Sequence, residues 1–137
     1  MSIVALDTNL IVRILTNDDP EQAQIAANLL QSYSDTPHRV FIPKTVLLEV
    51  EWVMRFTYKL DRVVIDRAFR HLLGLPNLFV EDDASVKQAM SWYEEGLDFA
   101  DALHLASSSI ADRFATFDLA LQKRARQLTN VIPVISP

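Results

Sequence analysis

The sequence has no cysteine, only two glycines, and no run of about 20 uncharged apolar residues. Without thiols, a disulfide scaffold, a zinc-thiolate or iron-sulfur site and a cysteine nucleophile are excluded, so any bound metal has to be held by oxygen or imidazole. The scarcity of glycine excludes a collagen-like repeat. Neither a membrane span nor a basic-then-apolar leader is recognisable. We therefore expect a soluble, cytoplasmic protein with no membrane partner.

The composition that remains is that of a folded protein. Of 137 residues, 50% are hydrophobic and 23% charged, and this length predicts one domain over 1–137. The net charge of −5 argues against a surface that grips nucleic acid everywhere. Residues 81–101 carry seven acids and one lysine, whereas 55–71 and 113–126 each have three more bases than acids. An acidic centre with basic margins suits a metal site that handles a polyanion, although solvated helix faces give similar patterns.

Hydrophobic periodicity gives the expected order of elements. Short apolar runs predict strands at 3–6, 40–42, 78–80, 114–117 and 131–135. Helical spacing and capping residues predict helices at 19–31, 43–58, 61–73, 84–93, 98–110 and 119–126. Strands that alternate with helices predict an α/β fold, with a mainly parallel sheet between helical layers. The 43–74 segment has no strand between its helices and predicts a helical hairpin insert that projects from the sheet.

Two acids in the first half of the chain are candidate functional residues. Asp7 directly follows the first predicted strand, where its ordinary structural role would be a helix N-cap. Glu49 lies within a predicted helix, and no basic residue stands three or four positions away on its face. Glu51, by contrast, has Arg55 four residues on and predicts an ordinary surface ion pair. We therefore interpret Glu49, and not Glu51, as a functional acid that faces inward.

Three further acids stand in the second half. Asp101 is embedded in an apolar, alanine-rich helix, and Asp98 shares its face because the two residues are three apart. Asp118 follows a predicted strand, as Asp7 does. A helix N-cap is the alternative role for Asp98 and Asp118. For Asp101 the alternative is a first-turn acid favoured by the helix dipole.

The structural role proposed for each acid does not explain why acids stand at two strand ends and on two helices. In an α/β fold these positions can meet at one edge of the sheet, which is where such folds bind ligands. Converging carboxylates repel each other, so a folded protein keeps them with a compensating cation. Oxygen ligands without thiolates favour Mg²⁺ or Mn²⁺. These ions activate water for in-line phosphoryl displacement. The residues therefore predict a metal-dependent nuclease or phosphatase.

Four segments stand in an order and spacing that resemble PIN-domain ribonucleases: IVALDTN at 3–9, PKTVLLE at 43–49, DFADALH at 98–104 and TFD at 116–118. The similarity covers the full chain and is closest to the VapC toxins of bacterial toxin-antitoxin modules. Each segment alone is a weak signal, whereas all four in order are a strong one.

The resemblance implies a three-layer α/β/α sandwich and an endoribonuclease that depends on Mg²⁺ or Mn²⁺. It also implies a homodimer, an RNA substrate and inhibition by a small cognate antitoxin. The residues it implies as catalytic and metal-binding are Asp7, Glu49, Asp101 and Asp118, with Asp98 as a further metal ligand. The residues it implies as orienting these acids are Asn9, Thr116 and Thr45.

Other classes remain as alternatives. A phosphatase that forms a phospho-aspartate would need a second acid two residues after Asp7, but position 9 is Asn. A response-regulator receiver would need adjacent acids after the first strand and a lysine after a late strand, which do not stand here. A PIN-like scaffold without catalysis is the non-enzymatic alternative, and retention of all four acids argues against it.

Overall fold

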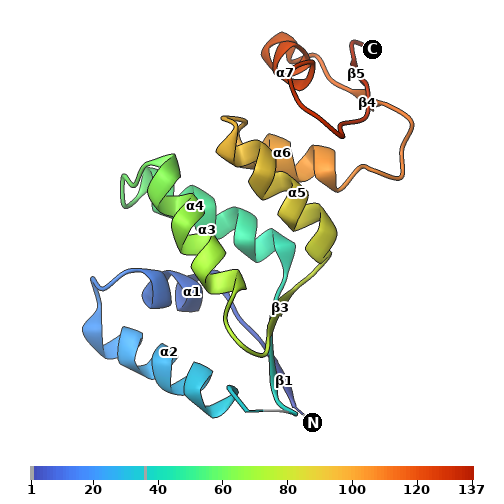
Figure 1. The fold of residues 1–137 in the computed structure, drawn as a ribbon. Helices are drawn as coiled ribbons and strands as arrows, with labels where there is room; N and C mark the ends of the chain where they lie inside the picture. The colour runs from blue at the N-terminus through green and yellow to red at the C-terminus, as the bar shows by residue number, and fades with distance from the viewer. Residues whose placement is uncertain (1, 36) are drawn as a thin grey trace. The chain divides into compact units, whose positions relative to one another are not determined.

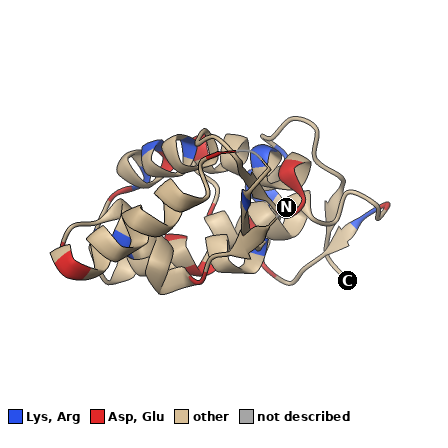
Figure 2. Ribbon diagram, turned by 90° about the horizontal axis from the view of Figure 1, so that it is seen from below, with Lys and Arg blue, Asp and Glu red and all other residues tan. Residues whose placement is uncertain are grey.

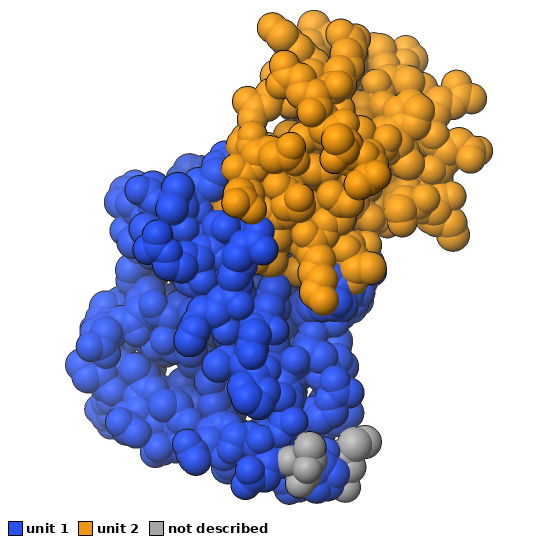
Figure 3. Space-filling model, viewed as in Figure 1, with its two compact units in different colours: residues 1–83 blue, residues 84–137 orange. Residues whose placement is uncertain are grey.

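A computed structural model describes residues 2–35 and 37–137 (Figure 1). The chain divides into two compact units, residues 1–83 and residues 84–137 (Figure 3). Each unit has its own strands and helices, and each is described by itself below. The single domain expected over 1–137 stays a prediction.

The strands of the first unit form a three-stranded parallel sheet in the order β1-β2-β3. The strands are β1 (Ile3–Ala5), β2 (Arg39–Ile42) and β3 (Leu78–Val80). Val40 in the central strand stands opposite Val4 on one side and Leu78 on the other. Parallel neighbours require crossover connections, and helices supply both of them. The prediction of an α/β fold with parallel strands is confirmed.

Two helices connect β1 to β2. They are α1 (Thr8–Leu15) and α2 (Pro20–Ser32), and they pack on each other. Asp7 and Asp19 cap them, because each side chain accepts a hydrogen bond from a backbone N–H of its own helix. Pro20 stands in the first helical turn of α2, where its missing N–H has no cost.

The helices α3 (Lys44–Phe56) and α4 (Arg62–Leu73) pack on each other as the predicted hairpin. The sequence suggested that this hairpin projects from the sheet, but it does not. Its helices form the crossover between β2 and β3, and α4 contacts β3. The reason is that each helix carries a fully buried apolar stripe, which includes Leu47 and Val50 in α3 and Ile65 and Phe69 in α4.

The second unit contains most of α5 (Asp83–Glu94), α6 (Phe99–Ala106), β4 (Phe114–Ala115), α7 (Leu119–Ala125) and β5 (Val134–Ile135). Large side chains build its core: Trp92 donates its indole N–H to the Thr129 carbonyl at 3.0 Å, and Tyr93 packs edge-on against Phe99. The strands β4 and β5 pair in parallel. In the described part of the chain the strands thus pair as two sheets, where the sequence suggested one central sheet.

The helix predicted over 98–110 is shorter in the structure. It ends at Ala106, and Ser107 is its C-cap. The hydroxyl of Ser108 donates to the carbonyl of His104 at 2.7 Å. Serine side chains compete with the helix for backbone partners in this way, so the three-serine run at 107–109 favours an end over a continuation.

Among the described residues, no helix is both long enough and apolar enough to cross a membrane.

Candidate functional site

The first unit brings together Asp7 and Glu49 through Thr8. The Asp7 carboxylate caps α1 and accepts a hydrogen bond from the backbone N–H of Thr8 at 2.7 Å. The Thr8 side chain is buried, and its hydroxyl donates a short hydrogen bond to the Glu49 carboxylate. This contact crosses from α1 to α3, which pack against each other. Thr8 therefore fixes two acids from different elements, while both carboxylates stay exposed.

Thr8 was not predicted from the sequence as a functional residue. The signal was its place directly after Asp7, at the first position of a helix. There its hydroxyl points away from the helix's own carbonyls and can reach another element. Asn9 is exposed and lines a pocket together with Asp7. Thr45 is exposed as well, and its side chain makes no hydrogen bond within the described part of the chain.

The inward-facing glutamate of α3 is Glu51, and the prediction was wrong on this point. Glu51 is only 1% exposed, whereas Glu49 is exposed. The buried stripe of α3 consists of Leu47, Val50, Glu51 and Met54, spaced three and four residues apart. Glu51 forms an ion pair with Arg55 at 3.0 Å. The pair was predicted correctly from its i,i+4 spacing, but it is not a surface pair.

The second unit brings together Asp98, Asp101 and Asp118. Asp98 caps α6 and accepts from the backbone N–H of Asp101 at 3.2 Å, so the N-cap alternative is correct for it. Asp118 caps α7 in the same way through the Leu121 N–H at 3.0 Å. A carboxylate has two oxygens and several lone pairs, so an N-cap hydrogen bond does not prevent the same group from binding a cation. The structural and the functional roles of these acids are therefore compatible.

Asp101 has a perturbed proton affinity. Its carboxyl is half-buried, and loss of solvation raises its pKa above the ordinary value. The negative charges of Asp98 and Asp118 raise this pKa further, whereas His104 lowers it. The three acids are thus close enough to oppose each other's ionisation.

Thr116 holds the segment before Asp118. Its hydroxyl accepts a hydrogen bond from the backbone N–H of Asp118 at 3.0 Å. Its carbonyl accepts from the side-chain amide of Gln122, a buried residue, at 2.9 Å. These contacts fix the turn that presents Asp118, which agrees with an orienting role for Thr116.

Three of the candidate acids share one structural context, because Asp7, Asp98 and Asp118 each cap a helix. Figure 2 shows the acidic residues of the chain in red. All the candidate ligands are carboxylates, a donor set that fits a hard cation such as Mg²⁺ or Mn²⁺. Within the residues that the structure describes, no group of three or more acids or histidines is arranged as a ready metal cage.

The parallel strands and the helices that join them place the chain in the α/β class. Acidic residues directly follow some of these strands. The family model named PIN domain matches residues 4–127, and the chain belongs to this family. PIN domains commonly act as metal-dependent nucleases. No curated protein matches the sequence.

Proposed function

We propose that this PIN domain is a metal-dependent endoribonuclease that hydrolyses RNA phosphodiester bonds and acts as the VapC-type toxin of a toxin-antitoxin pair. The observation that carries the proposal is the placement of Asp98, Asp101 and Asp118 at the starts of α6 and α7, where their negative charges oppose one another. A fold that keeps carboxylates in mutual repulsion gains stability from a bound cation. An RNA-cleaving toxin would act in the cytoplasm, where its substrate is.

The residues that we propose as metal ligands are Asp7, Glu49, Asp98, Asp101 and Asp118. Bound Mg²⁺ or Mn²⁺ would supply the Lewis acidity that lowers the pKa of water and offsets negative charge on the phosphate. In this proposal the chain's own residues set the geometry. Thr8 orients Glu49, Thr116 orients Asp118, and Asn9 and Thr45 stand beside the acids as further polar groups.

An assay of RNA cleavage with added Mn²⁺, with and without excess EDTA, tests this proposal. We expect cleavage that stops in EDTA and returns with excess metal. Asp7→Asn and Asp101→Asn should abolish it, because an amide is a poor ligand for a hard cation. Asp61→Asn is the matched control, since Asp61 also caps a helix but belongs to no candidate site. Activity on a phosphomonoester but not on RNA would favour a phosphatase, and no activity on either would favour a non-catalytic interaction module.

The α3–α4 hairpin supports the proposed antitoxin partner. The rings of Trp52 and Phe56 of α3 are in tilted contact, with centroids 5.1 Å apart, although the residues are 55% and 46% exposed. Val63 and Val64 at the start of α4 are exposed as well. Large apolar side chains in such numbers are typical of an interface. We propose that the antitoxin lays an apolar segment across this hairpin and sends a basic side chain toward the acids, where a cation replaces metal electrostatically.

Coexpression with the product of the neighbouring gene tests the partner. We expect a complex whose RNA cleavage is suppressed, and whose formation Trp52→Glu weakens while Thr57→Glu, at an exposed position one turn on, does not. A saturating partner that leaves metal affinity and cleavage unchanged would contradict this blocking role. We further propose a homodimer, for which light scattering at micromolar concentration should give twice the chain mass.

A further inference from the structure

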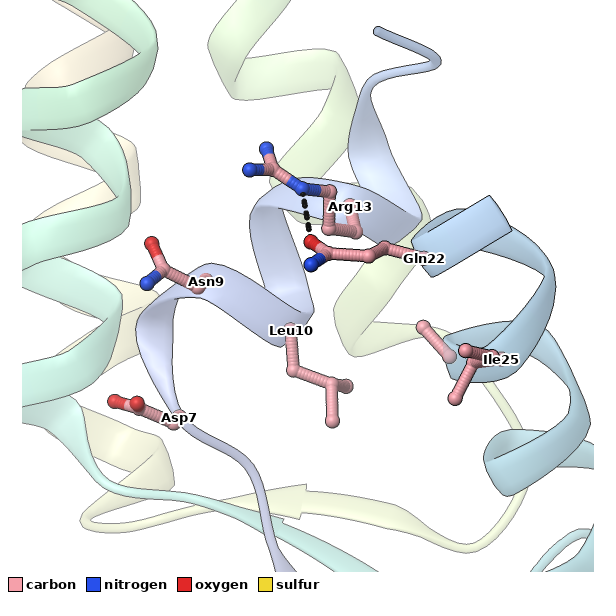
Figure 4. A pocket seen from close by; sticks show the side chains of 7 residues that line it. Asp7, Asn9, Leu10, Arg13, Gln22 and Ile25 are labelled. Atoms are coloured by element: carbon pink, nitrogen blue, oxygen red, sulfur yellow. Dashed lines mark hydrogen bonds between the residues drawn. The ribbon is translucent and has the colours of Figure 1, made fainter. Parts of the chain in front are cut away.

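A pocket opens between α1 and α2 of the first unit. Its volume is about 420 Å³, within the range of roughly 300–1,000 Å³ that small-molecule sites occupy. Leu10 of α1 and Ile25 of α2 face the same space (Figure 4). Ala26 also lines the pocket. Asp7 and Asn9 line one end, while Arg13 and Gln22 line the other (Figure 4).

The polar end of the pocket presents hydrogen-bond donors. The Arg13 Nε–H donates to Gln22 Oε1 at 2.7 Å. Because an arginine Nε–H is only a donor, this contact fixes the amide of Gln22 with its oxygen toward Arg13 and its nitrogen outward. Neither the Gln22 amide nitrogen nor the Arg13 Nη2 has a hydrogen-bond partner within the described part of the chain. Both groups therefore remain available as donors to a ligand.

A network behind the pocket holds Arg13 in place. Its Nη1 donates to the Tyr58 hydroxyl at 3.0 Å and lies 3.5 Å from Asp18. Tyr58 in turn donates to Asp18 at 2.7 Å, which is the main cause of the lowered pKa of that carboxyl. Asp18 therefore stays ionised near neutral pH and offsets part of the Arg13 charge. A site of this kind is better suited to a neutral group with acceptor atoms than to a bare phosphate.

We propose that the pocket binds one nucleobase of the RNA substrate and selects bases with a keto group, uracil and guanine, over the amino bases cytosine and adenine. The apolar walls fit the two faces of a flat ring, and the donors of Gln22 and Arg13 fit O4 of uracil or O6 of guanine. Cytosine and adenine present an amino group at the same place, which would face a donor. Asp7 lines the pocket and belongs to the proposed metal site, so the base would belong to a nucleotide near the scissile phosphate.

This inference rests on the proposed function for its substrate, but its test needs no cleavage. Hexamers of 2′-O-methyl uridine and 2′-O-methyl cytidine are titrated into the full chain in EDTA, and binding is followed by the methyl resonances of Leu10 and Ile25. We expect these resonances to shift and the uridine hexamer to bind roughly tenfold more tightly, equivalent to about 1.4 kcal/mol. Equal affinities, or shifts confined to other residues, would overturn the inference.

Two variants make the test specific. Gln22→Glu keeps an acceptor for Arg13 Nε but replaces the outward nitrogen by oxygen, so we expect the preference to move toward cytidine. Ile25→Trp fills the pocket and should weaken binding of both hexamers, whereas Gln24→Trp, on the same helix but outside the pocket, should not. An unchanged preference in Gln22→Glu, or unimpaired binding in Ile25→Trp, would assign the pocket to another occupant, such as an apolar side chain of a protein partner.

The binding and cleavage results separate the two proposals. Selective binding of the uridine hexamer without cleavage of any RNA in Mn²⁺ would support the pocket and contradict the nuclease. Metal-dependent cleavage without selective binding would support the nuclease and contradict the pocket.

Discussion

The hydroxyl of Thr8 donates a hydrogen bond to the carboxylate of Glu49, 41 residues away on another helix. Thr8 also offers its backbone N–H to Asp7, so a single residue connects two of the acids that the proposed site needs. The contact joins the helix that follows β1 to the helix that follows β2. In a parallel sheet these two helices begin at the same edge, so short polar side chains at their starts can meet.

Replacing Thr8 tests whether this contact matters for catalysis. Thr8→Val keeps the shape of the side chain but removes the hydrogen bond. We expect a loss of about 1 kcal/mol in the free energy of unfolding and a fall in RNA cleavage of roughly 10- to 100-fold. Urea denaturation and initial cleavage rates measure the two effects. Thr57→Val is the control at an exposed threonine, and if it impairs cleavage as much as Thr8→Val does, the contact with Glu49 has no special role.

The two glutamates of α3 should respond in opposite ways. Glu49 is exposed, so Glu49→Gln should change the free energy of unfolding by less than about 0.5 kcal/mol but abolish cleavage. Glu51 is buried and paired with Arg55, so Glu51→Gln should cost about 2 kcal/mol and leave cleavage largely intact below the melting temperature. Denaturation curves and cleavage rates of both variants distinguish a functional role for Glu49 from a structural role for Glu51. An inactive, fully stable Glu51→Gln would mean that the functional glutamate is Glu51.

These two glutamates also show what the sequence could reveal. The i,i+4 pairing of Glu51 with Arg55 was readable, because it depends only on helix geometry. Which glutamate is buried depends on the direction of the whole apolar stripe. Glu49 was preferred because no basic residue stands three or four positions away from it, and that criterion says nothing about burial. The stripe itself, with Leu47 and Val50 followed by Met54, includes Glu51 and was the better guide.

The order and type of most elements could be predicted because they depend on local signals, but α1 was not among the predicted helices. Apolar runs marked β1, β2 and β3, and Asp19 and Asp61 marked the helices that they cap. The crossover role of α3 and α4 was not predictable from those signals, since it depends on which strands pair. The role of Thr8 could not be predicted for the same reason, because its partner Glu49 is distant in sequence. The candidate acids were chosen because unpaired carboxylates near apolar positions are costly, and their role in a site stays a prediction.

The reaction products distinguish hydrolysis by water from attack by the RNA's own hydroxyl. If a metal-activated water attacks the phosphate, the fragments should carry 5′-phosphate and 3′-hydroxyl ends. End-group analysis by mass spectrometry checks this expectation with a short oligonucleotide. A substrate with 2′-deoxy sugar at the cleaved position is the control, because it can still be hydrolysed by water. Fragments with 2′,3′-cyclic phosphate, or cleavage that persists in excess EDTA, would contradict the mechanism.

The pKa of Asp101 predicts how stability depends on pH and metal. Burial and the charges of Asp98 and Asp118 raise this pKa in the folded state. Folding therefore favours the protonated form of Asp101. The stability that this form contributes is complete below the unfolded pKa, and it is lost as pH rises through the raised folded pKa. At pH 7 the metal-free protein therefore bears the cost of an ionised Asp101, and Asp101→Asn removes that cost.

We expect metal-free Asp101→Asn to be at least as stable as the parent at pH 7 and to lose that advantage at pH 3. Its stabilisation by Mn²⁺ should be reduced, because a ligand stabilises the fold in proportion to its binding. Thermal melts in EDTA and in Mn²⁺ at both pH values measure these effects. Asp61→Ala is the control for a purely structural acid, since it removes an N-cap and should cost about 1 kcal/mol in either solution. If Asp101→Asn behaves like this control, with lower stability and an unchanged response to Mn²⁺, then Asp101 supports the helix and the metal is held elsewhere.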